Sequence, residues 1–275
     1  MTNMITAEDG PHLLGLLREQ GLLPDTYLCV YAAGSLVRGW GNETSDLDLY
    51  VVTDDGASDE GENGTPAASA GVEDFHPVAL TPDRVPVAVP TLGDRRGDVE
   101  YWSAGQLEQL MAKISWEAYR SERDIGATVS QVERDALVKL GHAIALDGVP
   151  WLEERQRLLR SSAFGRTIAA RGLDLADTFA EDALGQLGSG DAESAVLTAK
   201  LAFGYAADAL LAHHGEYGTT AKWRSKRYRA AAPTVLPFEP YWRIETMRDY
   251  DPDDPGRWIE DVIGCVRRIS MEVEV

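Results

Sequence analysis

The sequence predicts an α+β protein in which a small mixed-sheet domain, residues 1–116, is followed by an α-helical domain, residues 117–275. Two observations carry this prediction. Up to Ser103, short runs rich in β-branched and aromatic residues alternate with turns that contain Gly or Pro, as in the strands of a sheet. Beyond Ser103, apolar residues recur at three- and four-residue spacing, which is typical of amphipathic helices. We place the domain boundary near residue 116, where the pattern changes.

The first domain is expected to open with a helix and continue with strands. The leucines of 12–23 have helical spacing, and Pro24-Asp25 follows them. The runs with strand composition are 26–33, 45–53, 77–80, 85–92 and 98–103. Prolines interrupt the fourth of these runs, which we therefore expect to be an edge strand or an irregular one.

The second domain is expected to consist mainly of helices. The runs with helical spacing are 104–115, which leads into the domain, then 129–146, 151–162 and 192–215. Gly190-Asp191 is a plausible cap for the last of these, since Asp commonly caps helix N-termini. A proline-rich loop and a final helix are expected within 249–270.

The charge of the chain bears on its partners. Its 45 acidic and 26 basic residues give a net charge of −19, which disfavours nucleic acid as a partner and favours a cationic substrate. Alternatively, the charge mainly serves solubility. Segment 54–71 holds five acidic residues, no basic residue and few large apolar ones, so we expect a mobile loop there. No feature of the sequence indicates an oligomeric state.

The sequence also predicts a cellular location. We expect no membrane span, because no long apolar run is present, and no signal peptide, because the start lacks a basic region followed by an apolar one. Cys29 and Cys265 are the two cysteines. They do not form a disulfide framework, and Cys29 is expected to be a small core residue. The cytoplasm is therefore the expected compartment.

Two carboxylates stand out at the start of the strand 45–53. Asp46 and Asp48 are two residues apart, so their side chains point to the same face of a strand. Such a pair repels unless one group is protonated or a cation is shared. Oxygen ligands suit Mg²⁺ or Mn²⁺, and Mg²⁺ completes its shell with water and substrate phosphate. The pair therefore predicts a metal-binding site in which a substrate phosphate completes the coordination of the metal ion.

Gly34-Ser35 is the candidate for binding that phosphate. It closes the strand 26–33, and glycine lets the backbone approach a ligand closely. Ser35 can donate its hydroxyl group to a phosphate oxygen. A helix starting with Leu36, Val37 and Arg38 would add a favourable N-terminus for an anion, and Arg38 joins the nucleotide-binding candidates.

In this order, Gly34-Ser35 followed after a spacer by Asp46-Leu47-Asp48 resembles the signature of the DNA polymerase β-like nucleotidyltransferase superfamily. The resemblance is strongest over 26–53 and looser over 26–116. In its organisation, a small α/β unit followed by helices, the chain is most similar to antibiotic (aminoglycoside) nucleotidyltransferases. The resemblance implies a polymerase β-like catalytic domain and a helical domain that completes the active-site cleft.

The resemblance also implies two Mg²⁺ ions and a third carboxylate on a neighbouring strand. Asp98 is the candidate, with Glu100 as its rival, because both lie in the strand 98–103 and share a face. By analogy, Asp46 and Asp48 bridge both metal ions, and Asp98 binds the metal ion nearer the nucleophile. Glu100 is alternatively the general base.

Two basic positions are further nucleotide-binding candidates. KWRSKRYR, residues 222–229, holds five basic residues and no acidic one. Lys222 can grip the triphosphate or the leaving pyrophosphate; alternatively, the cluster is a solvated helix face paired with acidic residues elsewhere. Lys200, in an otherwise apolar helix, is the second candidate, with a side chain that snorkels at the helix edge as the alternative.

The resemblance implies an enzyme that moves a nucleoside monophosphate from an NTP, with ATP as the expected donor, to a hydroxyl group of a small molecule and releases pyrophosphate. The negative charge favours a cationic, aminoglycoside-like acceptor and a role in antibiotic resistance. The alternatives are a protein-directed AMPylating enzyme, a module of the toxin–antitoxin type, and a degenerate member that only binds nucleotide.

Overall fold

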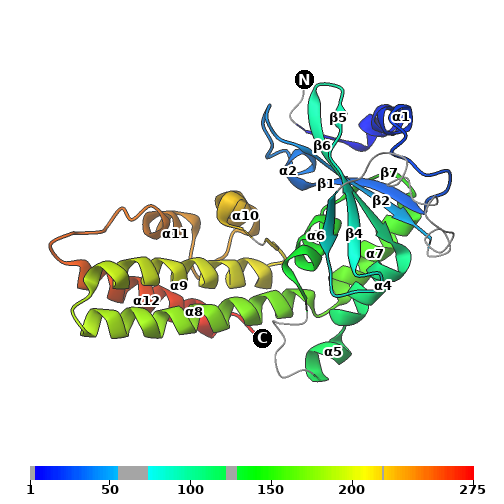
Figure 1. The fold of residues 1–275 in the computed structure, drawn as a ribbon. Helices are drawn as coiled ribbons and strands as arrows, with labels where there is room; N and C mark the ends of the chain where they lie inside the picture. Colours follow the sequence, from blue (N-terminus) through cyan, green and yellow to red (C-terminus); the bar gives the residue numbers. More distant parts are fainter. Residues whose placement is uncertain (1–3, 55–73, 122–128, 219) are drawn as a thin grey trace. The chain divides into compact units, whose positions relative to one another are not determined.

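The computed structural model describes residues 4–54, 74–121, 129–218 and 220–275. The chain forms two compact units (Figure 1). Unit 1 comprises Met1–Ala118 and Val129–Ser162, and unit 2 comprises Tyr119–Thr128 and Ala163–Val275. The predicted order of a mixed-sheet part and a helical part is confirmed. However, the expected single boundary near residue 116 is wrong for residues 129–162, which belong to unit 1. The predicted loop 54–71 lies, after Asp54, outside the described residues.

The described part of unit 1 contains a seven-stranded mixed sheet (Figure 1). Its strands are β1 (Cys29–Ala33), β2 (Leu47–Thr53), β3 (Asp74–Pro77), β4 (Arg84–Ala88), β5 (Thr91–Leu92), β6 (Arg95–Ser103) and β7 (Ile144–Asp147). The spatial order is β3-β4-β6-β2-β1-β7, and β5 pairs with β6. Strands β2 and β6 run parallel, whereas the other pairs are antiparallel.

Three predictions about the sheet need correction. The predicted strand 77–80 is wrong, because β3 ends at Pro77. The run 85–92 splits into β4 and β5, which bears out the alternative of an irregular strand, but β4 is not an edge strand, because it lies between β3 and β6. Pro86 is tolerated there because the pairing of β4 with β6 involves Val87 and Ala88, the residues after it. Residues 144–147, predicted as the end of a helix, form β7 and pair with β1.

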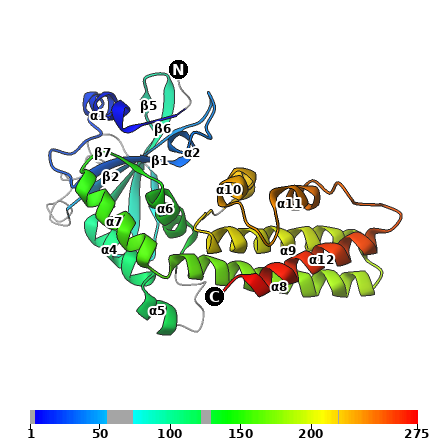
Figure 2. The same cartoon turned by 180° about the vertical axis from the view of Figure 1, so that it is seen from behind.

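Helices flank the sheet of unit 1 (Figures 1 and 2). They are η1 (Ala7–Asp9), α1 (Gly10–Glu19), α2 (Gly34–Val37), α4 (Ala104–Lys113), α6 (Gln131–Gly141) and α7 (Val149–Ser161), while α5 (Trp116–Ser121) spans the unit boundary. The leucines of α1 form a buried cluster with alternate residues of β2, among them Leu47, Leu49 and Val51. Because strand residues alternate between faces, the residues between them point to the opposite face of the sheet.

Unit 2 is helical in all its described elements. These are α8 (Phe164–Gly188), α9 (Ala192–His213), η3 (Ala221–Trp223), α10 (Arg224–Ala231), α11 (Phe238–Glu245) and α12 (Pro255–Glu272). Helices α8, α9 and α12 lie side by side (Figures 1 and 2). The predicted cap of α9 is confirmed, because the Asp191 side chain accepts a hydrogen bond from the Ser194 amide. The final helix, α12, is confirmed as well, but α8 was not among the predicted helices.

Helix α9 also bears on the prediction that no segment spans a membrane. Among the described residues, it is the one helix that is long and apolar enough to do so by length and composition. In the structure, 67% of its most apolar window is buried, chiefly alanines packed in the core of unit 2. Core helices commonly pass this test, so α9 is weak evidence for a membrane span.

Candidate active site

One face of the sheet carries a row of polar side chains. In the parallel pair β2–β6, Asp48 lies opposite Asp98 and Tyr50 lies opposite Glu100. Partners in register on adjacent strands point to the same face. Since Leu47 and Leu49 pack towards α1, this polar face lies on the other side of the sheet. The register therefore confirms that Asp98 and Glu100 share a face, and it places Asp48 on the same face. Asp46 precedes β2, so the shared face of Asp46 and Asp48 stays a prediction.

The Asp48 side chain lies directly against the backbone of Gly34. A Cβ atom added to Gly34 would lie 1.9 Å from Asp48 Oδ2, and Gly34 has a φ of +78°. Both the contact and the conformation require glycine. Gly34 opens α2, which contains only four residues. Gly34 therefore allows a close approach, and the group that approaches it here is the Asp48 carboxylate. The approach of a phosphate to Gly34 stays a prediction.

Asp46 lies just before β2, at the end of a hydrogen-bonded turn. The Asn42 amide donates to Ser45 Oγ at 2.9 Å, and the Ser45 amide donates to the Asn42 carbonyl at 3.1 Å. From β6, the Arg95 guanidinium donates to the carbonyl oxygens of both residues at 3.2 Å. Arg95 therefore holds the turn that leads into Asp46.

The structure distinguishes the two candidates for the third carboxylate. Asp98 is level with Asp48 in the register, is partly exposed and contacts the exposed Arg96 at 3.4 Å. Glu100 is buried, and both of its oxygens accept hydrogen bonds, from the Tyr50 hydroxyl at 3.0 Å and the Trp102 indole at 2.9 Å. The geometry favours Asp98 as a ligand and Glu100 as a fixed, internal charge.

Lys139 of α6 completes this cluster and was missed by the sequence analysis. Its Nζ lies 2.9 Å from Asp48 Oδ1, 3.8 Å from Glu100 Oε1 and 5.4 Å from the centre of the Tyr50 ring. Its position three residues after the buried Ala136, at the edge of the apolar stripe of α6, is the signal that could have indicated an inward-reaching lysine.

The surroundings of Lys139 and Tyr50 keep both groups protonated. Burial alone would lower the pKa of Lys139, but the charges of Asp48 and Glu100 outweigh it and raise that pKa. Burial, followed by the charges of Glu100 and Asp48, raises the pKa of Tyr50 well above its ordinary value. Tyr50 is also stacked on Tyr31, with ring centres 4.8 Å apart. It therefore remains a neutral donor to Glu100.

The carboxylates of this face are suited to a divalent cation. Asp48 already binds a cationic group, the ammonium of Lys139, at 2.9 Å. Among the described residues, no group of three or more His, Cys, Asp or Glu side chains is arranged to hold a metal ion. Mg²⁺ does not need one, since it commonly takes one or two carboxylates and completes its shell with water and phosphate. Asp48 and Asp98, which lie opposite one another, fit that donor set, and the role of Asp46 as a ligand stays a prediction.

The remaining nucleotide-binding candidates divide between the units. Ser35 and Arg38 belong to the α2 region beside Asp48, and the Arg38 guanidinium lies 3.8 Å from the centre of the Trp40 ring. Lys200 lies on α9 and Lys222 in η3, both in unit 2. The structure therefore gathers Gly34, Ser35 and the carboxylates in one unit, while the roles of Lys200 and Lys222 stay predictions.

The basic cluster 222–229 has two parts. Arg224 and Arg227 turn inward and bind Asp208 of α9. Lys222 and Lys226 are exposed and lie 5.5 and 5.3 Å from the centre of the Trp223 ring. Pairing with an acidic residue, one part of the alternative, thus holds for Arg224 and Arg227, which are largely buried rather than solvated, whereas the two lysines face solvent. The guanidinium of Arg229, the fifth basic residue, lies 3.5 Å from the centre of the Phe238 ring.

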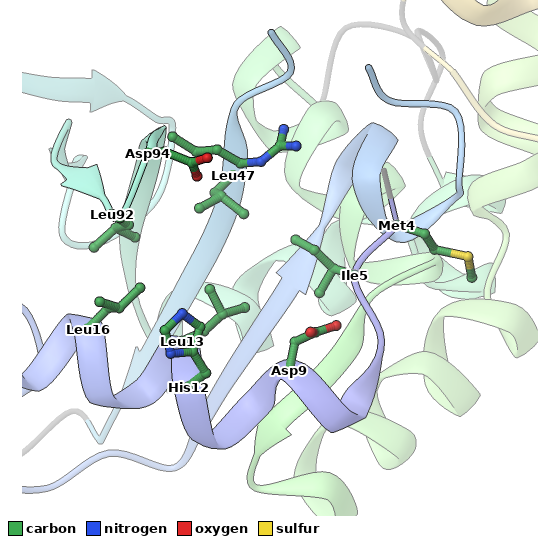
Figure 3. A pocket seen from close by; sticks show the side chains of 11 residues that line it. Met4, Ile5, Asp9, His12, Leu13, Leu16, Leu47, Leu92 and Asp94 are labelled. Carbon is green, nitrogen blue, oxygen red and sulfur yellow. The ribbon is translucent and has the colours of Figure 1, made fainter. Parts of the chain in front are cut away.

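A pocket of about 390 Å³ opens on the α1 side of the sheet (Figure 3). Leu13, Leu16, Leu47 and Leu92 form its apolar part, and Asp9, His12 and Asp94 lie around them (Figure 3). Among the predicted site residues, none lines it. Leu47 and Asp48 are neighbours that point to opposite faces, so this pocket is separate from the polar face.

Comparisons with known proteins find matches among solved structures. Neither a protein-family model nor a curated protein matches this sequence. Among solved structures, the chain is similar to a nucleotidyltransferase-like protein from Exiguobacterium sibiricum 255-15, with 10% sequence identity and a TM-score of 0.48. The similarity covers 96% of this chain and 74% of that chain.

Proposed function

We propose that this protein is a Mg²⁺-dependent nucleotidyltransferase that moves a nucleoside monophosphate from an NTP to a hydroxyl group of a small molecule. The observation that carries the proposal is the arrangement around Asp48. It lies opposite Asp98 on the neighbouring parallel strand and against Gly34 of the Gly-Ser turn. This arrangement supports the proposal because the carboxylates that would hold a metal ion lie beside the Gly-Ser turn that would contact a phosphate.

In this proposal, Asp46, Asp48 and Asp98 hold the metal ions, and Ser35 donates its hydroxyl to a phosphate oxygen. The bound ions would neutralise triphosphate charge and lower the pKa of the acceptor hydroxyl. The acceptor oxygen forms a bond to the α-phosphorus, the α–β bridging oxygen leaves with pyrophosphate, and the acceptor's proton is released. We do not assign Glu100 as the general base, because both of its oxygens are engaged by Tyr50 and Trp102.

We further propose ATP as the donor and a cationic, aminoglycoside-like molecule as the acceptor. The net charge of −19 supports the choice of acceptor, because a negative surface raises the local concentration of cationic molecules. Modification of such a molecule would make the enzyme an antibiotic-resistance factor.

The test is pyrophosphate release by the full chain with Mg²⁺, each of the four NTPs and a panel of acceptors. The panel pairs polyamine sugars with neutral sugars of the same size. We expect release with ATP and a cationic acceptor, and its loss in the Asp48→Asn variant. Asp94→Asn is the matched control, because Asp94 is an exposed carboxylate beside the other pocket. Equal release by the Asp48→Asn variant and the wild type would contradict the proposal.

A further inference from the structure

The ammonium group of Lys139 lies between two carboxylates that differ in accessibility. Asp48, at 2.9 Å, is at the accessible level of the polar face, with a side chain that is 21% exposed. Glu100, at 3.8 Å, has a side chain that is 11% exposed and is fixed by Tyr50 and Trp102. Lys139 therefore contacts the Asp48 carboxylate directly, and a small shift of its ammonium group would bring it to the Glu100 carboxylate.

The contact with Asp48 involves the oxygen that a metal ion would need. Asp48 Oδ2 faces Gly34, and Oδ1 is the atom that binds Lys139. A divalent cation and an ammonium group cannot both lie within bonding distance of the same carboxylate without strong repulsion. Binding of a metal ion at Asp48 therefore requires Lys139 to move.

A second lysine–carboxylate pair in unit 1, which joins α4 to α6, differs from the arrangement at Lys139. Lys113 binds Glu133 of α6 at 2.8 Å and also donates to the Ala79 carbonyl. Glu133 is fully buried and also accepts from the amides of Ala79 and Ser130. In that network one acid is paired with one base, and each carboxylate oxygen of Glu133 accepts a hydrogen bond. Lys139, in contrast, is shared by two acids.

We propose that Lys139 is a resident cation that neutralises Asp48 in the metal-free protein and withdraws towards Glu100 when Asp48 binds a divalent cation. This inference rests on the proposed function, because it takes Asp48 as a metal ligand. Glu100 acts as a positioning residue: its fixed carboxylate keeps the displaced ammonium inside the site. The Tyr50 ring, beside Lys139, adds a favourable cation–π surface along the way. The lysine thereby sets the affinity for the metal ion.

The proposal predicts opposite effects for two neighbouring residues. Lys139→Met removes the competitor, so Mn²⁺ should bind more tightly, by about tenfold, because the like charge that repels the ion at Asp48 is gone. Glu100→Gln removes the charge that receives the ammonium, so Lys139 stays on Asp48 and Mn²⁺ should bind about tenfold more weakly. A Gln side chain can still hydrogen-bond to both Tyr50 and Trp102, so the packing is kept.

The measurement is a titration of the full chain with Mn²⁺ alone, followed by the electron paramagnetic resonance signal of free Mn²⁺. Lys113→Met is the matched control, since it also removes a lysine paired with a glutamate in unit 1 but leaves Asp48 untouched. Circular dichroism establishes that each variant is folded. We expect the affinity order Lys139→Met, then wild type and Lys113→Met, then Glu100→Gln.

The possible outcomes separate this inference from the proposed function. Unchanged or weaker binding by Lys139→Met would overturn the resident cation, and unchanged or tighter binding by Glu100→Gln would overturn the withdrawal towards Glu100. If Asp48→Asn binds Mn²⁺ as well as the wild type, Asp48 is not a metal ligand, and both the proposed function and the inference fail. If Asp48→Asn alone loses binding, the metal site stands and only the inference fails.

Discussion

The two units each contain a cluster of charged side chains, and the clusters differ in their balance of charge. In unit 2, Asp208 accepts hydrogen bonds from Arg224 and Arg227 at 2.7–3.0 Å, and Arg224 also contacts Glu245 at 3.6 Å. Two bases thus meet two acids. In unit 1, a single base, Lys139, forms ion pairs with both Asp48 and Glu100.

This difference indicates which cluster is structural and which can bind a ligand. A balanced, largely buried cluster has its charges paired within the fold, and removing one partner leaves an uncompensated charge. An excess of carboxylates on an accessible sheet face is instead unfavourable until another cation joins it. Asp98, which is in register with Asp48, adds a carboxylate whose partner is the exposed Arg96. The polar face of unit 1 is therefore the part of the described chain that is best prepared for a cation.

The largest effect is expected when a carboxylate of the polar face in unit 1 is removed. We expect Asp48→Asn and Asp98→Asn each to lower nucleotidyl transfer roughly a thousandfold, since a metal ion contributes several kcal/mol to such a transition state. Glu100→Gln should retain most of the activity at saturating Mg²⁺. Steady-state pyrophosphate release measures all three. A larger loss in Glu100→Gln than in Asp98→Asn would reverse the assignment of the third carboxylate.

Gly34→Ala tests the close approach that holds Asp48. The added Cβ would overlap with Asp48 Oδ2, so the carboxylate must move, and we expect transfer to fall about a hundredfold. Gly21→Ala is the matched control. Gly21 also has a positive φ, +68°, but a Cβ added there would have no neighbouring atom within 4 Å. Gly21→Ala should therefore cost only the strain of the backbone conformation, about 1–2 kcal/mol. Equal activities of the two variants would show that the contact with Asp48 is dispensable.

The balanced cluster of unit 2 should respond in stability. Asp208→Asn leaves the buried Arg227 without its carboxylate, which should cost about 3 kcal/mol of unfolding free energy. The midpoint of thermal unfolding, followed by circular dichroism at 222 nm, should fall by about 6–12 °C. Asp174→Asn, at an exposed position of α8, should leave it within about 2 °C. A drop no larger than that of Asp174→Asn would mean that the cluster contributes little to stability.

Local sequence patterns predicted the parts of the fold and site that depend on neighbouring residues. Gly34 and Asp48 lie within one short segment that joins β1 to β2, so their closeness followed from the sequence, while the chemistry of Asp46 and Asp48 stays a prediction. The strand β6 and the candidate Asp98 followed from alternation within one short run. The cap at Asp191 likewise depends on residues only three positions apart.

Features that depend on distant contacts were missed. Lys139 meets Asp48 only because β7 joins the sheet beside β1 and brings α6 into unit 1. The strand β7 itself follows α6 without a break in apolar spacing, so the run appeared to be a single helix. Helix α8 buries mainly small residues, such as Ala169, Gly172 and Ala176. These do not give the strong apolar stripe that indicates a helix, yet they allow α9 to pack closely.

The smallest expected effect concerns Lys222, the exposed part of the basic cluster in unit 2. Its ammonium lies 5.5 Å from the centre of the Trp223 ring, so Lys222→Ala should change unfolding free energy by less than about 0.5 kcal/mol. If Lys222 contacts the triphosphate, as the sequence predicts, the variant should bind a non-hydrolysable ATP analogue about tenfold more weakly, the effect of one charge-assisted hydrogen bond.

Lys226→Ala is the matched control, because Lys226 is also exposed and lies 5.3 Å from the centre of the same ring. Calorimetric titration of both variants at low and moderate salt separates a specific contact, lost in one variant, from a general effect of positive charge, which would weaken both equally and more so at low salt. Unchanged affinity in both would assign the exposed lysines to the surface and leave nucleotide binding to residues other than these two.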